Sequence, residues 1–152
     1  MINLRFDTTE LVSPRYAYHP LTIIRLLADV RFVRADGHLS ESREAIVDTG
    51  AHTSVLPLTL WQRFAVEIDE KDVTLGGIND QPECQIPASL GKARCFLTDE
   101  TGRLSPELDI SCFLAKTDRV PLILGFANLL SQFKICFDYE NKEAFALPTS
   151  AG

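Results

Sequence analysis

The residues of this chain best suited to chemistry stand together at positions 45–51, Ala-Ile-Val-Asp-Thr-Gly-Ala. Asp48 directly follows an apolar run, and a carboxylate that enters an apolar interior costs several kcal/mol unless it is hydrogen-bonded or shares a proton. Two interpretations account for this placement. Asp48 either accepts backbone N–H bonds in a turn where Gly50 supplies a positive φ, or it is a catalytic aspartate in a pre-shaped loop.

A second motif lies downstream, Leu-Ile-Leu-Gly at residues 122–125, followed by Phe-Ala-Asn-Leu-Leu and then Phe-Lys-Ile at 133–135. In this order the two motifs resemble the active-site segment and the apolar-apolar-Gly element of the retropepsin-like, or retroviral-type, aspartic proteases. The resemblance covers roughly residues 21–147. Its first motif is far more specific than its second.

The resemblance implies a mainly β fold: a single-domain, closed β-barrel with one or two short helices and a flap hairpin. Residues 21–152 would form the protease domain and residues 1–20 an N-terminal extension with a candidate interface strand. Terminal strands near 2–6 and 144–147 would join an intersubunit sheet. Leu124 and Gly125 would pack beneath the catalytic loop.

The resemblance also implies roles for the motif residues. Asp48 would be the catalytic carboxylate, and the Thr49 hydroxyl would tie two such loops together. Gly50 would let backbone N–H groups approach the carboxylates, and Ala51 would keep the space beside them small. The chain would then be an aspartic endopeptidase, an enzyme that hydrolyses peptide bonds in a peptide or protein substrate.

Aspartic-protease chemistry needs two carboxyl groups that share one proton, one acting as base toward water and the other as acid toward the carbonyl oxygen. This chain contains a single Asp-Thr-Gly and no Asp-Ser-Gly. If Asp48 is catalytic, its partner must come from a second copy of the chain, with the site on a twofold axis. The expected assembly is therefore a homodimer.

Substrate contacts are expected from two segments, Ala51 with His52, and Gly76, Gly77 and Ile78. The second segment belongs to a strand that enters a glycine-rich loop over residues 73–82. As a flap, this loop would close over a bound peptide and exclude water, using the backbone freedom of paired glycines. The alternative is an ordinary long hairpin tip.

The chain departs from the family at two places. Viral members commonly follow the alanine of the motif with acidic residues that hold the substrate backbone, whereas here His52 and Thr53 follow it. His52 is either an exposed loop residue or a group close enough to the aspartates to bias their pH response. At the flap, Asn79, Asp80 and Pro82 replace a small apolar tip.

Composition and net charge exclude some classes of binding partner. The chain has 152 residues, 45% of them hydrophobic, which suits one domain with a sizeable core. A net charge of -6, a pI near 5.0 and the absence of a basic cluster argue against nucleic acid or an anionic membrane as partner. No apolar run suits a signal peptide, so a cytoplasmic protein is expected.

Neither the cysteines nor the histidines show the spacing of a metal site. They are Cys84, Cys95, Cys112, Cys136, His19, His38 and His52. Buried, reduced thiols are the simplest interpretation of the cysteines, with a disulfide or redox role as the alternative. No metal and no cofactor is expected.

Period-two alternation and apolar runs predict many short strands. They fall at residues 2–6, 21–34, 44–47, 84–90, 93–98, 108–114, 120–124, 133–139 and 144–147. Asp36-Gly37 predicts a hairpin turn, because this pair supplies positive φ values. Helical spacing predicts a short helix with Pro57 at its first position and a second, amphipathic helix over residues 126–133.

Three hypotheses follow. The preferred one is an active homodimeric aspartic endopeptidase acting on extended, apolar-flanked peptides. The second is a catalytically inactive protease-fold dimer that serves as a peptide-binding or oligomerisation module. The third is an unrelated β domain with a chance Asp-Thr-Gly.

Overall fold

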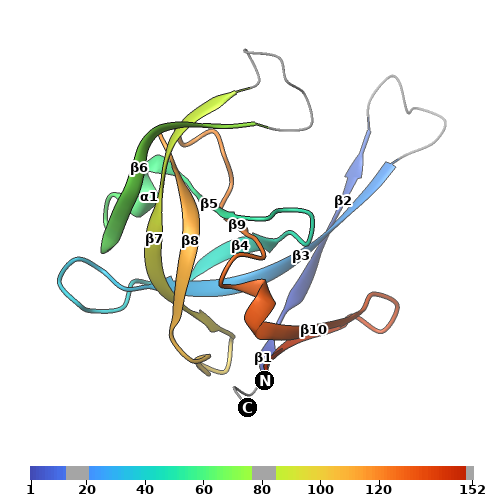
Figure 1. Ribbon diagram of the computed structural model, residues 1–152. Helices are drawn as coiled ribbons and strands as arrows, with labels where there is room; N and C mark the ends of the chain where they lie inside the picture. Colours follow the sequence, from blue (N-terminus) through green and yellow to red (C-terminus); the bar gives the residue numbers. More distant parts are fainter. Residues whose placement is uncertain (13–20, 77–84, 150–152) are drawn as a thin grey trace.

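The computed structural model describes residues 1–12, 21–76 and 85–149 of the chain. Strands dominate this part, so the predicted mainly β class is confirmed (Figure 1). The strands are β1 (Ile2–Asn3), β2 (Arg5–Leu11), β3 (Leu21–Phe32), β4 (Arg43–Val47), β5 (Ser54–Leu56), β6 (Val66–Leu75), β7 (Ile86–Thr98), β8 (Leu108–Ala115), β9 (Ile123–Leu124), β10 (Phe133–Asp138) and β11 (Glu143–Pro148). The helices among the described residues are α1 (Leu58–Trp61) and the 3-10 helix η3 (Leu130–Gln132).

The strands form two sheets. The larger has eight strands in the order β2-β3-β4-β9-β5-β8-β7-β6, and β3 also pairs with β7. Most of its pairs are antiparallel, but β4 with β9 and β5 with β8 are parallel. The smaller sheet has the order β1-β11-β10. In Figure 1 the first half of β3, paired with β2, projects to the upper right away from β6, β7 and β8, whereas the end of β3 pairs with β7.

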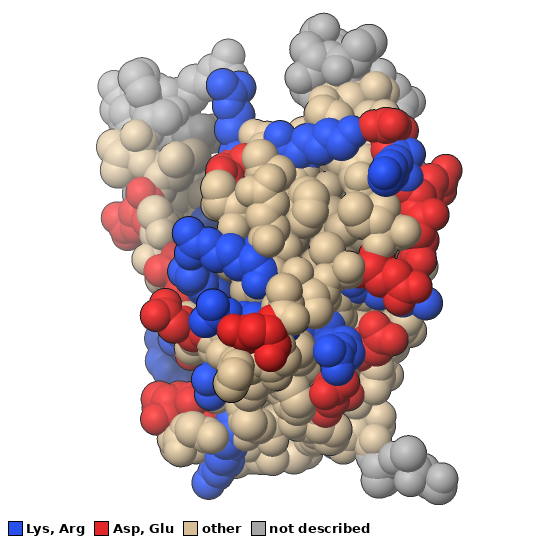
Figure 2. Space-filling view, turned by 90° about the vertical axis from the view of Figure 1, so that its left-hand side faces the viewer, with Lys and Arg blue, Asp and Glu red and all other residues tan. Residues whose placement is uncertain are grey.

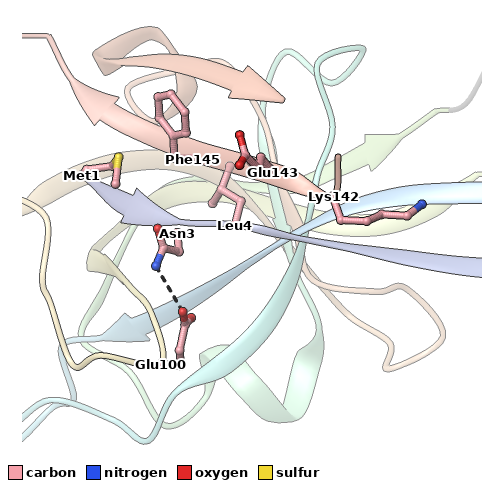
Figure 3. Close-up of a pocket in the computed structure, with 8 residues that line it drawn as sticks. Met1, Asn3, Leu4, Glu100, Lys142, Glu143 and Phe145 are labelled. Carbon is pink, nitrogen blue, oxygen red and sulfur yellow. Dashed lines mark hydrogen bonds between the residues drawn. The ribbon is translucent and has the colours of Figure 1, made fainter. Parts of the chain in front are cut away.

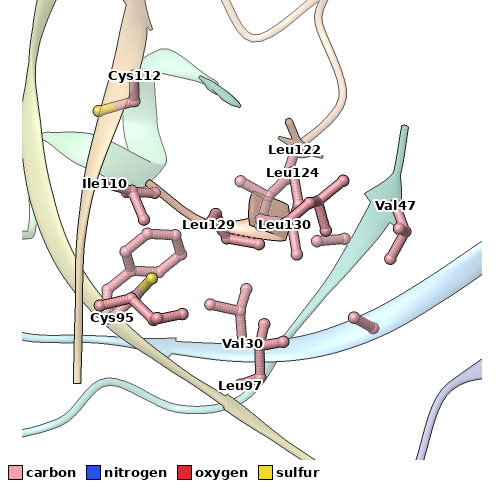
Figure 4. Packing of buried hydrophobic residues seen from close by; sticks show 14 of the residues in the cluster. Val30, Val47, Cys95, Leu97, Ile110, Cys112, Leu122, Leu124, Leu129 and Leu130 are labelled. Carbon is pink, nitrogen blue, oxygen red and sulfur yellow. The ribbon is translucent and has the colours of Figure 1, made fainter. Parts of the chain in front are cut away.

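The main core is formed by inward-pointing alternate side chains of the larger sheet, and residues of the smaller sheet, such as Ile2 and Ala146, pack into the same cluster. On β8, Leu108, Ile110, Cys112 and Leu114 are each no more than 2% exposed. Figure 4 shows Val30, Leu97 and Ile110, from β3, β7 and β8, directed toward leucines 122, 124, 129 and 130. Burying one such aliphatic side chain contributes about 1.5–3 kcal/mol.

The first strands are built into both sheets. β1 pairs with β11, and the Leu4 N–H donates to the Ala144 carbonyl at 2.9 Å. On β2, the Arg5 guanidinium donates to Asp29 at 2.7 and 2.8 Å and to Glu44 at 2.6 Å, which joins β2 to β3 and β4. β11 lies between β1 and β10. The expected intersubunit strand at residues 144–147 therefore has no free edge.

The helix predicted over residues 126–133 is wrong in its extent. Turns occupy residues 126–129, and only the three residues of η3 are helical. Asn128 has a φ of +57°, a left-handed conformation that an α-helix cannot contain. The apolar spacing still reports burial, because Leu129, Leu130 and Phe133 are buried while Phe126 is exposed.

The helix predicted after residue 56 is present but is one turn long, and Pro57 is its N-cap residue rather than its first helical residue. Leu56, Leu60 and Phe64 have helical spacing, but Leu56 belongs to β5 and only Leu60 belongs to α1, so these three residues do not form one helical face. Phe64 lies beyond α1 and stacks on Phe32, with ring centroids 4.5 Å apart. Trp61 packs against the core and donates its indole N–H to the Ala115 carbonyl at 2.8 Å.

Two strands are longer than predicted. β7 is one continuous strand where two were expected, since Gly91 allows it to pass close to β6: a Cβ there would lie 2.3 Å from the Glu67 carbonyl oxygen. β6 begins at Val66 and includes an acidic stretch that does not alternate in polarity. Register shifts on either side of Glu70 interrupt it, and Asp72 has a φ of +59°.

The strand predicted at residues 2–6 is divided between β1 and β2, which belong to different sheets, and β2 continues to Leu11. Most of the other predicted elements are present with small shifts. The turn at residues 35–38 contains Gly37 at a φ of +86°, as Asp-Gly predicts. The final hairpin is formed by β10 and β11. The strand predicted at 120–124 is reduced to β9, which begins two residues after Pro121.

The described surface shows both signs of charge. On the face drawn in Figure 2, basic and acidic side chains are interspersed, and neither kind forms a continuous area. In the described ranges, the helices are too short to cross a membrane.

Candidate active site

Asp48 stands at the end of β4, and the neighbouring strand determines its position. Ala45 and Val47 turn inward on β4 and are buried. The Ile46 N–H donates to the Leu122 carbonyl at 2.9 Å, and the Asp48 N–H donates to the Leu124 carbonyl at 3.0 Å. The parallel pairing of β4 with β9 therefore fixes the backbone from which the half-buried Asp48 side chain leaves.

The loop after Asp48 folds back on the carboxylate. The Gly50 N–H donates to Asp48 Oδ1 at 2.8 Å, and the Ala51 N–H donates to the Asp48 carbonyl at 3.2 Å. A Cβ at residue 50 would lie 3.2 Å from Asp48 Oδ1, tighter than ordinary van der Waals contact. Gly50 therefore lets a backbone donor reach the acid, as the sequence predicts, although not through a positive φ.

Gly125 lies directly beneath this loop, as the resemblance implies. A Cβ at Gly125 would lie 2.7 Å from the Thr53 carbonyl carbon and 2.9 Å from the Ala51 carbonyl oxygen. The N–H groups that follow bind the loop: Phe126 donates to the Ala51 carbonyl at 3.0 Å and Ala127 to that of His52 at 2.7 Å. The two sequence motifs are therefore one structural unit.

Ser54 is a site residue that sequence reasoning missed. Its hydroxyl is fully buried and accepts the Gly125 N–H at 3.0 Å. A buried donor without a partner costs about 1–3 kcal/mol, so this hydrogen bond keeps the two motifs together. A small polar residue inside the otherwise apolar run at 54–57 was the available signal.

A cleft of about 860 Å³ opens beside Asp48. Its other wall is a small apolar cluster, separate from the main core, formed by Val55, Ala115 and Val120 with four half-buried neighbours packed on it. Those neighbours are Leu75, Ile86, Phe113 and Ile123. An acid beside an apolar cleft of this size suits a site for an extended organic ligand.

The structure brings most of the predicted site residues together. Asp48, Gly50, Ala51, His52 and Gly76 all line this cleft. Thr49 is exposed and is not among the lining residues. The expected flap residues Gly77 and Ile78 lie outside the described residues, as does the predicted tip at 79–82.

Sequence reasoning missed the apolar half of the cleft. The residues concerned are Thr53, Val55, Leu75, Ile86, Phe113, Val120, Pro121 and Ile123. They come from β5 to β9 and the adjoining segments. No local pattern marks such residues as site-lining, because each looks like an ordinary strand or loop residue in its own segment.

Within the described part of the cleft, Asp48 is the only carboxylate. The described residues also contain no group of three or more metal-ligating side chains. At Cys95 and Cys112, nucleophilic chemistry is disfavoured by burial, which raises the pKa of Cys112 to about 12 and moves the pKa of Cys95 in the same direction. Both thiols therefore stay protonated. A protonated thiol is a poor nucleophile, because the thiolate is the reactive form.

A second cavity, of about 450 Å³, lies beside β1 and β11. Figure 3 shows Asn3 and Glu100 on its wall, joined by a hydrogen bond of 3.1 Å, with Met1 and Phe145 nearby. Its titratable lining groups are Glu100, Lys142 and Glu143, all exposed. Exposed charges of this kind are poorly placed for acid–base chemistry, so the cleft at Asp48 is the better candidate site.

The chain was also compared with known proteins. No protein-family model and no curated protein matches it.

Proposed function

We propose that this protein is an aspartic endopeptidase of the retropepsin type that works as a homodimer. In this proposal a water molecule, activated by two Asp48 carboxylates, one from each subunit, hydrolyses a peptide bond. The observation that carries the proposal is the placement of Asp48: a lone carboxylate, on a loop braced by Gly125, at the wall of an apolar cleft.

The chemistry explains why one acid is not enough. One carboxylate accepts a proton from water as the water oxygen attacks the carbonyl carbon, while the other, protonated, donates its proton to the carbonyl oxygen. The peptide nitrogen then takes a proton as the C–N bond breaks. Two carboxyl groups within hydrogen-bonding distance of each other cannot both ionise, so they share one proton. A second copy is the available source of the second group.

The fold is consistent with this assignment. β3 pairs with both β4 and β7, and this supports a closed barrel in which strand pairings return to their starting strand. The bracing of the Asp48 loop by the segment after β9 supports the retropepsin resemblance of the two motifs. The substrate would be an extended peptide with an apolar side chain placed against Val55, Phe113 and Val120.

The direct test is Asp48→Asn, which keeps the size of the side chain but removes the group that takes the proton from water. Cleavage of a peptide library at mildly acidic pH should fall by about 10³-fold, within the range expected for loss of a general base. Cleavage is measured by mass spectrometry of the products, and dimerisation by sedimentation.

Asp118→Asn is a matched control, because Asp118 is exposed and accepts hydrogen bonds from Thr59 away from the cleft. It should keep full activity. Cleavage that survives Asp48→Asn would exclude this carboxylate pair. If the wild-type protein forms a dimer and binds peptides but never cleaves them, an inactive binding module is favoured.

A further inference from the structure

His52 occupies a special electrostatic position in the cleft. It is exposed and, among the described lining residues, the only one whose side chain can carry a positive charge. Its carbonyl accepts the Ala127 N–H at 2.7 Å, and its ring Nδ1 lies 3.1 Å from the Thr53 hydroxyl. These contacts leave Nε2 without a partner among the described residues, so it can meet a ligand.

The charges around His52 are few. The segment packed beneath its loop, residues 125–128, carries no ionisable side chain. On the segment that leads to Val120, Lys116 is paired with Asp72, and Asp118 accepts hydrogen bonds from Thr59. Arg119, next to it, is not a lining residue. Among the described residues, Asp48, together with the Asp48 of a second copy, therefore supplies the other charge that the cleft presents to a ligand.

We propose that His52 is a specificity residue that selects peptides carrying an Asp or Glu side chain close to the apolar residue in the cleft. The inference rests on the proposed function. Imidazole is protonated below its ordinary pKa of about 6.5, where a shared-proton carboxylate pair operates. A protonated His52 would then donate a charge-assisted hydrogen bond to the substrate carboxylate. Without it, the charge on the aspartates and the net charge of -6 disfavour an acidic peptide.

The test uses peptides with both ends blocked, so that a side chain is the only carboxylate. Two peptides share one apolar cleavage sequence and differ by Glu or Gln at a neighbouring position. At pH 5 the Glu peptide should have about fivefold higher kcat/KM, the size expected for a partly exposed ion pair. The ratio should fall toward one by pH 8, where imidazole side chains in general are neutral.

In His52→Gln the Glu-to-Gln ratio should be near one at every pH, whatever happens to the overall rate. His38→Gln is the matched control, since His38 is exposed on the turn at residues 35–38, far from the lining set, and should keep the wild-type ratio. An unchanged ratio in His52→Gln overturns the proposal. A third peptide carries Gln and a free C-terminal carboxylate. If the enzyme prefers this peptide to the blocked Glu peptide, the proposal is also overturned, because the recognised group would then be a chain end.

A binding measurement separates this inference from the proposed function. The same blocked peptides are titrated into the Asp48→Asn protein and followed by fluorescence anisotropy. If the Glu peptide binds more tightly in a His52-dependent manner while the wild-type protein cleaves neither peptide, the protease assignment fails and the specificity assignment stands. If cleavage occurs but neither kinetics nor binding distinguishes Glu from Gln, the reverse holds. If no peptide binds and the wild-type protein cleaves none, both are overturned.

Discussion

At the scale of single residues, Gly125 is where the site is most sensitive to added volume. A Cβ there would lie within 3 Å of backbone atoms of Ala51 and Thr53, and backbone cannot move aside as a flexible side chain can. Gly125→Ala should therefore destabilise the fold by about 1–3 kcal/mol, the usual cost of overpacking. The midpoint of urea unfolding measures this loss.

Gly76→Ala is the matched control for stability. It also lines the cleft, but no atom of the described residues lies within 4 Å of the position its Cβ would take, and its φ is not positive. This variant should unfold within about 0.5 kcal/mol of the parent, as surface substitutions usually do. Equal stability of the two variants would show that the loop over Gly125 can shift, contrary to the geometry described.

At the scale of elements, Asp99 anchors β1. Its carboxylate accepts the Asn3 N–H at 3.0 Å and two hydrogen bonds from Thr101. Burial raises the pKa of Asp99, but these hydrogen bonds together lower the pKa by more than burial raises it. The resulting pKa lies below the ordinary value of an aspartate. A carboxyl with a lowered pKa stabilises the fold above its unfolded pKa of about 3.9, and the contribution is lost as pH falls through the folded pKa.

Asp99→Asn should therefore lower stability at pH 7 by about 2 kcal/mol, within the range of a hydrogen bond to a charged group. The difference from wild type should shrink at pH 3 and vanish at lower pH, where both side chains are neutral. Denaturant unfolding at each pH measures it, with Glu140→Gln, on the exposed β10–β11 turn, as control. A difference that stays constant down to pH 2 would rule out a role for the charge.

The strands were more predictable than the helices, for physical reasons. Alternation along β8 follows directly from one face being buried, so the sequence shows it. In β10 the sequence alternates as well, but Phe133 is buried while Phe137 on the same face is exposed. The spacing from Phe126 to Phe133 equally marks burial, but the left-handed Asn128 bends the chain before a helix can form. In β6 the tertiary pairing with β7 overrides a local sequence that resembles a surface loop.

The same division holds for the candidate site. Asp48 and Gly125 could be found because each belongs to a short contiguous motif. Ser54 and the apolar wall could not, because their roles arise from pairings between distant segments, such as β5 with β8. Thr49 was expected to tie two loops together, and that expectation concerns a second copy of the chain.

At the scale of the whole molecule, the proposed site requires two chains, and this predicts a dominant effect of inactive protein. When wild-type chains are unfolded and refolded with an equal amount of Asp48→Asn, about a quarter of the dimers carry two intact aspartates. Activity per wild-type chain should fall to about half. Peptide cleavage before and after refolding is the measurement.

The reference for this experiment is wild-type protein refolded with an equal amount of Asp118→Asn, whose substitution lies outside the cleft lining. Its activity per chain should not fall. If Asp48→Asn also leaves the activity of its wild-type partner untouched, each chain works alone and the shared site is wrong.

The bracing of Asp48 by Gly125 also has a consequence for biosynthesis. During translation Asp48 is synthesised early, whereas β9 and Gly125 follow only after β5, β6, β7 and β8 have been synthesised. Until then the nascent polypeptide carries its acid on a loop that nothing supports. Under the proposed function, the chain would therefore be unable to cleave peptides until translation has passed Gly125.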